Sequence, residues 1–281
     1  MRSIVHPGTP AAPRAPALPC HVRELAVTFA AGQPVLEAVT EALAPLGIDS
    51  AVVEIAGGVL APLVYVMPAP SDDGVHAAWY SETHAPEGRS PIEAMTFSYG
   101  RRDGEPFLHC HGIWRHADGS RHAGHLMPMD ARFAEPVDAR VLAVSGAVFD
   151  QLEDDETRFR LFTPVAHGGQ HEGQRGLLCR IKPNVDVHQA IEQICADNDI
   201  ASASLHGIGS LVGCDFVTGA RMTSYASELF IRSGSVDRRD GMPVATLDIA
   251  IVDIDGGIFE GEIERGGNVV CVTFELLLVE R

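Results

Sequence analysis

The sequence lacks paired cysteines, an excess of positive charge and long apolar runs, and each absence excludes a class of protein. None of the six cysteines belongs to a Cys-x-x-Cys pair, and their scatter through a long chain is not typical of a disulfide framework. We therefore expect reduced thiols, most of them buried, at Cys20, Cys110, Cys179, Cys195, Cys214 and Cys271.

The charge balance and the hydropathy pattern limit the possible partners. Lys and Arg total 21 against 38 acidic residues, a net charge of −17, which argues against contact with a phosphate backbone, so no nucleic-acid partner is expected. No run of about 18 apolar residues indicates a membrane span. The N-terminus has no charged region followed by an apolar one, so a signal peptide is not indicated and a cytoplasmic location is expected.

The 281 residues suit two domains of ordinary size, and a hydrophobic content of 46% allows a sizeable core. Residues 1–21 differ from the rest because they carry a proline at every third position from Pro7 to Pro19. That period matches the polyproline II helix, so we expect an extended N-terminal arm. It would wrap a neighbour, cover a site or remain a loosely held tail.

The globular part contains an internal repeat. The hairpin that begins at Asp103-Gly104 is repeated from Asp240-Gly241, with similar residues at matching positions. Three histidines of the first copy are absent from the second, where a constant offset replaces His109, His111 and His125 by Thr246, Asp248 and Glu262. A fold that needed these imidazoles for stability would have kept them in both copies. Their presence in one copy therefore indicates chemistry there.

Each copy also begins with a predicted helix, near residues 34–43 and 186–198. Strands are expected after each helix, with tight turns at Gly57-Gly58 and at Gly207 and Gly209. The predicted fold class is α+β, with two tandem units that each pack a mostly antiparallel sheet against a helix. The predicted ranges are 22–165 for the unit with the histidines, 166–174 for a linker and 175–281 for a degenerate second unit that serves as a structural partner.

The first copy carries additional residues between helix and hairpin, within 67–92. Long insertions beside a site are often lids, and the alternative is a loop without function. This insertion includes Tyr80 and His84.

The three histidines are suited to metal binding. His109 and His111 are two residues apart on a predicted strand, so their side chains share one face. A three-residue loop centred on Asp118, with Gly119 left-handed, would place His111 opposite His125. Three converging imidazoles suit Zn²⁺ or another divalent transition metal, and three protein ligands leave a position for water or substrate. The alternative is a set of polar, partly exposed positions on a sheet face.

Catalytic partners for such a metal are harder to place from the sequence. Glu54 ends a predicted strand, and Tyr80 and His84 lie in the insertion, so each is a candidate general acid or base. Arg101 and Arg102 precede the hairpin and are candidates to bind a substrate carboxylate.

The motif Asp103-Gly-x-Pro-Phe-Leu-His-Cys-His, followed by Asp118-Gly and Gly124-His125-Leu126, resembles the plant and prokaryote conserved (PPC) domain. The second copy, with Ser227-Glu228-Leu229 and Arg239-Asp240-Gly241-x-Pro243, resembles a divergent member. The resemblance implies α+β units that assemble into trimers and, in some prokaryotic members, a metal held by the three-histidine pattern. Plant members are DNA-associated through AT-hook motifs, but this sequence has no Arg-Gly-Arg-Pro hook.

Three functions follow as hypotheses. The first is a metal-dependent enzyme, a hydrolase or lyase acting on a small molecule through the N-terminal unit. The second is a regulatory module that binds a protein or DNA. The third is a sensor in which the metal binds a small ligand without turnover. In each case we expect a homo-oligomer, most simply a trimer.

Overall fold

The computed structural model describes residues 2–168 and 172–281, and strands dominate it. Strands make up 54% of the chain and helices only 8%, so the predicted α+β class is wrong: the fold is mainly one large antiparallel sheet. The physical reason is that alternating and apolar strand patterns run through nearly the whole chain. The two α-helices of the described residues are short, so they cannot form a layer of their own.

The strands of the first half are β1 (Ala17–Phe29), β2 (Ala51–Ile55), β3 (Val59–Leu60), β4 (Tyr65–Val66), β5 (Pro68–Ala69), β6 (Trp79–Tyr80), β7 (Ser90–Arg102), β8 (Glu105–Arg115), β9 (Arg121–Leu126), β10 (Val137–Ser145), β11 (Ala147–Glu153) and β12 (Arg160–Ala166). Those of the second half are β13 (Gln174–Ile181), β14 (Ser202–Leu211), β15 (Cys214–Asp215), β16 (Arg221–Met222), β17 (Ser227–Arg239), β18 (Met242–Asp253), β19 (Ile258–Glu262) and β20 (Val270–Glu280).

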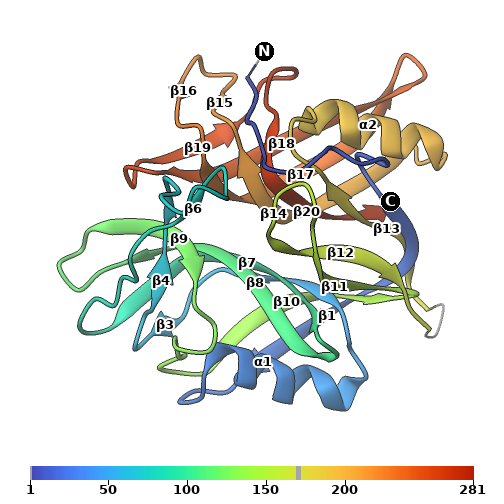
Figure 1. The fold of residues 1–281 in the computed structure, drawn as a ribbon. Coiled ribbons are helices and arrows are strands. Elements are labelled where there is room, and N and C mark those ends of the chain that lie inside the picture. Colours follow the sequence, from blue (N-terminus) through green and yellow to red (C-terminus); the bar gives the residue numbers. More distant parts are fainter. Residues whose placement is uncertain (1, 169–171) are drawn as a thin grey trace.

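Strand β1 joins the two halves into a continuous sheet (Figure 1). Its residues 21–29 pair antiparallel with β10, and its residues 17–22 pair antiparallel with β13 of the second half. The main strand order is β19-β18-β17-β14-β20-β13-β1-β10-β2-β7-β8-β9-β4. The predicted arm over residues 1–21 thus ends inside the sheet, because β1 begins at Ala17.

The helices form close to where the sequence predicts them. Helix α1 (Val35–Leu43) continues into a 3-10 turn (Ala44–Leu46) and stops at Gly47, which adopts a left-handed φ of 67°. Helix α2 (Val187–Asp197) is capped by Asp186, whose carboxylate accepts a hydrogen bond of 3.0 Å from the Gln189 backbone N–H. Each helix buries one apolar face against the strands of its own half.

The two halves are in direct contact through the hairpin of the first. Ile113 and Ala123, on β8 and β9, form a small buried cluster with Phe230 and Ala250 of β17 and β18. Burial of this apolar surface fixes the histidine-bearing hairpin against the second half. The site described below therefore contains side chains from both halves.

The first residues of the arm lie on the second half. The Arg2 guanidinium is 2.7 Å from the Asp215 carboxylate, and the ring of His6 is hydrogen-bonded to the Cys271 carbonyl at 2.8 Å. The predicted linker over 166–174 begins at the end of β12 and ends at the start of β13; its residues 169–171 lie outside the described part of the chain.

All six cysteines are free and buried, as the sequence predicts. Within the described ranges, no helix has both the length and the apolar character needed to span a lipid bilayer.

Candidate metal centre

The hairpin formed by β8 and β9 has the register that the sequence predicts. His111 lies directly opposite His125, and the pairing continues outward to Arg115 and Arg121. The loop is closed by hydrogen bonds from the His116 N–H to the Ser120 carbonyl and from the Gly119 N–H to the His116 carbonyl, and Gly119 adopts a left-handed φ of 83°. The twist of this short loop therefore sets the face on which His125 projects.

The three imidazoles converge on one point. One ring nitrogen from each of His109, His111 and His125 lies within 4.8 Å of the other two. The Nε2 atoms of His109 and His111 are 3.1 Å apart, and the His109 and His125 ring centroids are 4.8 Å apart. His111 is only 3% exposed, whereas the other two are half-buried. This arrangement can hold a metal ion.

The second half supplies the groups behind these rings. Nδ1 of His109 is 2.8 Å from a carboxylate oxygen of Glu275 on β20, and Nδ1 of His111 is 2.8 Å from the Leu229 carbonyl on β17. A carboxylate and a carbonyl at this position fix the ring tautomer, so that the other nitrogen, Nε2, presents its lone pair to the centre. Sequence reasoning missed this second set of residues.

Burial determines the protonation of the site. Burial and the neighbouring imidazoles hold the pKa of His111 and of His125 well below the usual value for histidine, so both rings are neutral at pH 7. Burial also raises the pKa of Glu228, which lies 3.8 Å from His125 Nδ1. Neutral imidazoles are the form that binds a transition metal.

Several buried polar atoms here fit a bound cation. Within the described residues, His125 Nδ1 and one carboxylate oxygen each of Glu228 and Glu275 have no hydrogen-bond partner. Buried polar atoms are usually hydrogen-bonded in folded proteins, and these three lie beside the imidazoles. Three nitrogen donors with acidic groups behind them suit Zn²⁺ or a similar divalent ion, with His109, His111 and His125 as its ligands.

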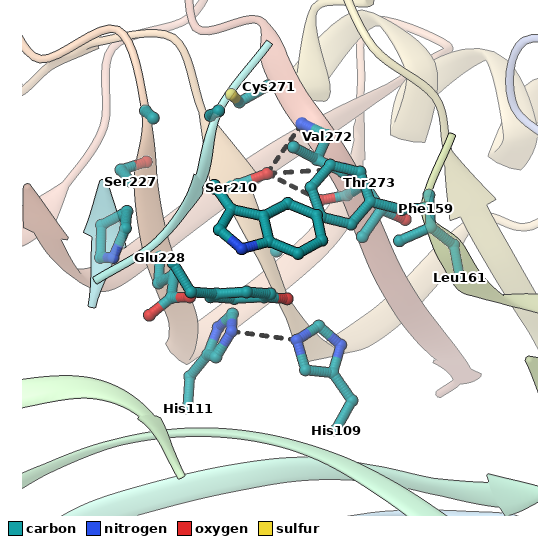
Figure 2. Close-up of a pocket in the computed structure, with 16 residues that line it drawn as sticks. His109, His111, Phe159, Leu161, Ser210, Ser227, Glu228, Cys271, Val272 and Thr273 are labelled. Carbon is teal, nitrogen blue, oxygen red and sulfur yellow. Dashed lines mark hydrogen bonds between the residues drawn. The ribbon is translucent and has the colours of Figure 1, made fainter. Parts of the chain in front are cut away.

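Two cavities adjoin the imidazoles. The smaller, of about 60 Å³, lies between the halves and is lined by His109, His111, Glu228, Ser210 and Thr273 among others. Figure 2 shows Glu228 beside the two histidines, with Ser210 hydrogen-bonded to the Val272 backbone N–H at 2.9 Å above them. The larger, of about 320 Å³, includes His109 and His125 in its wall. Each cavity thus reaches two of the three imidazoles.

Part of the insertion over 67–92 covers the centre. The ring of Tyr80, on β6, lies edge-on to His125 with centroids 5.2 Å apart, and Trp79 stacks on Phe159 at 5.1 Å. Both aromatic residues remain partly exposed. Of the three predicted acid–base residues, Tyr80 is the one that the structure brings to the imidazoles.

The other two lie elsewhere. Glu54 is hydrogen-bonded to His206 at 2.6 Å and to Arg140 at 2.9 Å, and it contributes to neither cavity at the histidines. His84 stacks on Tyr65 with ring centroids 4.9 Å apart. Glu54 therefore lies between the two halves, and His84 lies beside the turn of the hairpin.

The two arginines before the hairpin differ in their surroundings. Arg101 is held by Asp150, with 2.8 Å between Nε and a carboxylate oxygen. Arg102 lies 5.4 Å above the Phe107 ring and lines the larger cavity together with His109 and His125. Only Arg102 is therefore placed to meet a ligand at the histidines.

Two site residues carried a signal that sequence reasoning overlooked. Glu275 is an acid within the apolar strand Phe274 to Val279, and Glu228 stands in a similar run on β17. A carboxylate in a buried strand must find a partner, because an isolated buried charge is costly. An acidic residue of this kind therefore indicates a polar site at the place where its strand packs against the rest of the protein.

The second hairpin, of β18 and β19, has the same pairing as the first. Asp248 lies opposite Glu262, in the positions that His111 and His125 occupy in the first copy. Arg232 is near Asp248, at 3.5 Å between Nε and a carboxylate oxygen. The scaffold of the hairpin is therefore repeated, while the imidazoles belong to the first copy alone.

Comparison with known proteins supports the resemblance read from the motifs. Residues 168–281 match the family model described as the Plants and Prokaryotes Conserved (PCC) domain. This match confirms the resemblance for the second half of the chain. No curated protein matches the sequence significantly.

Several solved structures are similar at low identity. A metal-containing protein from Archaeoglobus fulgidus is 20% identical over 51% of this chain and 94% of its own length, with a TM-score of 0.42. A plant- and prokaryote-conserved protein from Pyrococcus horikoshii is 16% identical over 53% and 96%, also with a TM-score of 0.42. A candidate DNA-binding protein from Bacteroides thetaiotaomicron is 12% identical over 51% and 96%, with a TM-score of 0.38.

Proposed function

We propose that the protein is a metal-dependent enzyme, of hydrolase or lyase type, that acts on a small molecule at the junction of its two halves. The observation that supports this most directly is the pair of hydrogen bonds at 2.8 Å from His109 Nδ1 to Glu275 and from His111 Nδ1 to the Leu229 carbonyl. They orient two imidazoles toward a common point beside a cavity. A structural metal site would instead be closed on all sides.

The three imidazoles would hold the ion, with zinc the best fit to all-nitrogen ligands. Bound there, a divalent metal polarises a carbonyl oxygen and lowers the pKa of water. Glu228 lines the smaller cavity beside His109 and His111, and one of its carboxylate oxygens has no hydrogen-bond partner among the described residues. We assign it the transfer of the reaction's proton, a role for which a buried carboxyl with a raised pKa is suited.

Tyr80 has a positioning role in this proposal. Its ring covers His125, and it contributes to both cavities. The insertion that carries it would exclude water from the site when a ligand is bound. The two tandem units then have unequal roles, since 22–165 supplies the metal ligands while 175–281 supplies Glu228 and Glu275. A homotrimer remains our expectation for the assembly.

Metal analysis of the purified protein tests the proposal. We expect about one divalent ion per chain in the wild type, and its loss in His125→Ala. His122→Ala is the matched control, because His122 lies on the same strand but is hydrogen-bonded to Ser120 at 2.9 Å near the turn. A wild type without metal, or stoichiometric metal in His125→Ala, would refute the metal site.

The catalytic part requires a second measurement. Glu228→Gln should keep its metal but lose turnover of any ester, amide or lyase substrate that the zinc-loaded wild type converts. Binding without turnover across such a panel would favour the sensor hypothesis instead.

DNA binding is the competing function, and the chain charge of −17 argues against it. A gel-shift experiment at low salt is expected to show no retention of duplex DNA. Retention that weakens steeply with added salt would overturn this expectation.

A further inference from the structure

We propose that the larger cavity binds a monocarboxylate with an apolar or aromatic body, and that Arg102 and Arg160 hold the carboxylate. The inference rests on the proposed function, because His109 and His125 lie in the wall of the same cavity. It names the class of substrate that the centre would meet. The cavity volume of about 320 Å³ is within the range of small-molecule sites.

The two arginines converge at one end of the cavity through Asp103. Arg160 makes a two-pronged ion pair with this carboxylate, at 2.7 and 3.0 Å, and Arg102 Nε lies 3.9 Å from the same group. Both guanidinium groups are therefore within reach of one small anion. Asp103 adopts a positive φ of 53° at the tight turn between β7 and β8, which places it between them.

Both arginines retain donors for a ligand. Arg160 uses Nη1 and Nη2 for Asp103, and Nη2 also donates to the Gln151 carbonyl at 3.2 Å, so among the described residues one N–H of Nη1 is left for a ligand. Arg102 stacks over Phe107 and makes no shorter ion pair than the one at 3.9 Å. Stacking on an aromatic ring fixes the plane of a guanidinium but leaves its edge free for two parallel hydrogen bonds to a carboxylate.

The charge around the cavity disfavours more than a single negative charge on the ligand. Two guanidinium groups stand against the Asp103 carboxylate at this end, and the Glu153 and Asp150 carboxylates also act on Arg160, so little positive charge is left for a ligand. Glu275, which also lines the cavity, would repel a second negative charge. A carboxylate matches this balance better than a phosphate dianion.

The remaining wall is mostly apolar. It is formed by Val66, Phe107, Met127, Phe159, Leu161 and Phe162, together with the polar residues Tyr80 and Gln151. A ligand with a hydrocarbon or aromatic body would bury its surface here, with its carboxylate at the arginines and its reacting group at His109 and His125. The arginines thus orient the substrate, and the metal centre acts on its other end.

Calorimetric titration of the full-length protein tests the inference without a turnover assay. The probes are benzoate, phenylacetate and 3-phenylpropionate, with the corresponding amides as uncharged matches and inorganic phosphate as the dianion. We expect at least one carboxylate to bind at millimolar concentrations or below, and its amide to bind more weakly. Arg102→Gln and Arg160→Gln should each weaken that binding roughly tenfold to a hundredfold.

Arg101→Gln is the control variant, because this neighbour is already paired with Asp150. It should bind the carboxylate like the wild type. The inference is overturned if no carboxylate binds, if amides or phosphate bind equally well, or if Arg102→Gln and Arg160→Gln bind with unchanged affinity. Metal content measured on the same samples separates the two proposals. If every variant contains metal and the titrations give one of these negative results, only the carboxylate site is refuted. If the wild type contains no metal, the proposed function is refuted.

Discussion

Nδ1 of His109 lies 2.8 Å from a carboxylate oxygen of Glu275, although the two residues belong to different halves of the chain. Glu275 is completely buried, and Arg180 lies opposite it on the neighbouring strand β13. Through this contact with His109 the second half contributes to the site although it lacks the three imidazoles. Its strands position an acid that orients one of the three imidazoles from behind.

Replacement of this carboxylate should weaken metal binding without abolishing it. Glu275→Gln keeps a hydrogen-bond acceptor for His109 but removes the charge, so we expect the zinc affinity to fall about tenfold to a hundredfold. Competition with a chromophoric chelator measures the change. Glu280→Gln, at the exposed end of the same strand, should leave the affinity unaltered. Equal affinities in the two variants would contradict the role of Glu275.

Glu54 should matter for stability and not for metal binding. Its hydrogen bond to His206, at 2.6 Å, links the two halves. Burial alone would raise the pKa of Glu54, but the interactions with His206 and Arg140 lower it overall. Glu54→Gln is expected to lower the free energy of unfolding by about 1–3 kcal/mol, measured by urea denaturation. Glu24→Gln removes the more exposed partner of Arg140 and should change it by less than about 1 kcal/mol. Loss of metal from Glu54→Gln would place this residue in the site after all.

A buried ion pair should determine part of the acid stability. Asp154 and Arg180 are both nearly inaccessible and 2.8 Å apart. Burial alone would raise the pKa of Asp154, but the Arg180 charge and the hydrogen bonds from Thr157 lower it overall. The pair therefore stabilises the fold above the ordinary aspartate pKa of about 4, and this stabilisation is lost as the pH falls through the lower value in the folded state.

Asp154→Asn should accordingly cost about 3–5 kcal/mol at pH 7, because it leaves a buried guanidinium without its counter-charge. The difference from the wild type should shrink as the pH falls below about 4 and through the lower pKa of Asp154 in the folded state, because the carboxylate becomes protonated first in the unfolded and then in the folded wild type. Urea unfolding at several pH values measures both effects. Asp155→Asn, a fully exposed neighbour, is the control. A difference that is constant from pH 7 to pH 3 would show that the charge is not responsible.

Tyr80 should control how fast a metal leaves. Because its ring covers His125, Tyr80→Ala is expected to accelerate removal of zinc by a chelator several-fold, with a smaller effect on the affinity at equilibrium. Tyr80→Phe retains the cover and should release metal at the wild-type rate. Stopped-flow mixing with excess chelator follows the release. Identical rates in all three proteins would show that the insertion does not act as a lid.

The sequence predicted the local features whose causes are local. The turn chemistry of Asp118 and Gly119 fixed the hairpin register, so the convergence of His109, His111 and His125 followed from strand geometry. The helix starting after Asp186 was likewise predictable from its cap. The pattern of apolar residues did not distinguish two sheets with helices from one continuous sheet, because β1 pairs with partners far apart in the sequence.

Two glycines show the same difference between local and tertiary causes. Gly207 and Gly209 read as a tight turn, but both lie inside β14. A side chain at Gly207 would place its Cβ 2.0 Å from the carbonyl oxygen of Glu275, so the glycine is needed for the close approach of β20. Such an approach depends on a strand that comes much later in the chain, and no local pattern reveals it.

The sequence by itself determined the three imidazoles, their shared face and their absence from the second hairpin, because these depend on a two-residue period and a short loop. Only the tertiary structure decided that Glu228 and Glu275 stand behind them, that Arg102 rather than Arg101 faces the cavity, and that Glu54 bridges the halves. Those relationships arise from packing between strands distant in the chain, where burial of apolar surface, not local conformation, sets which side chains meet.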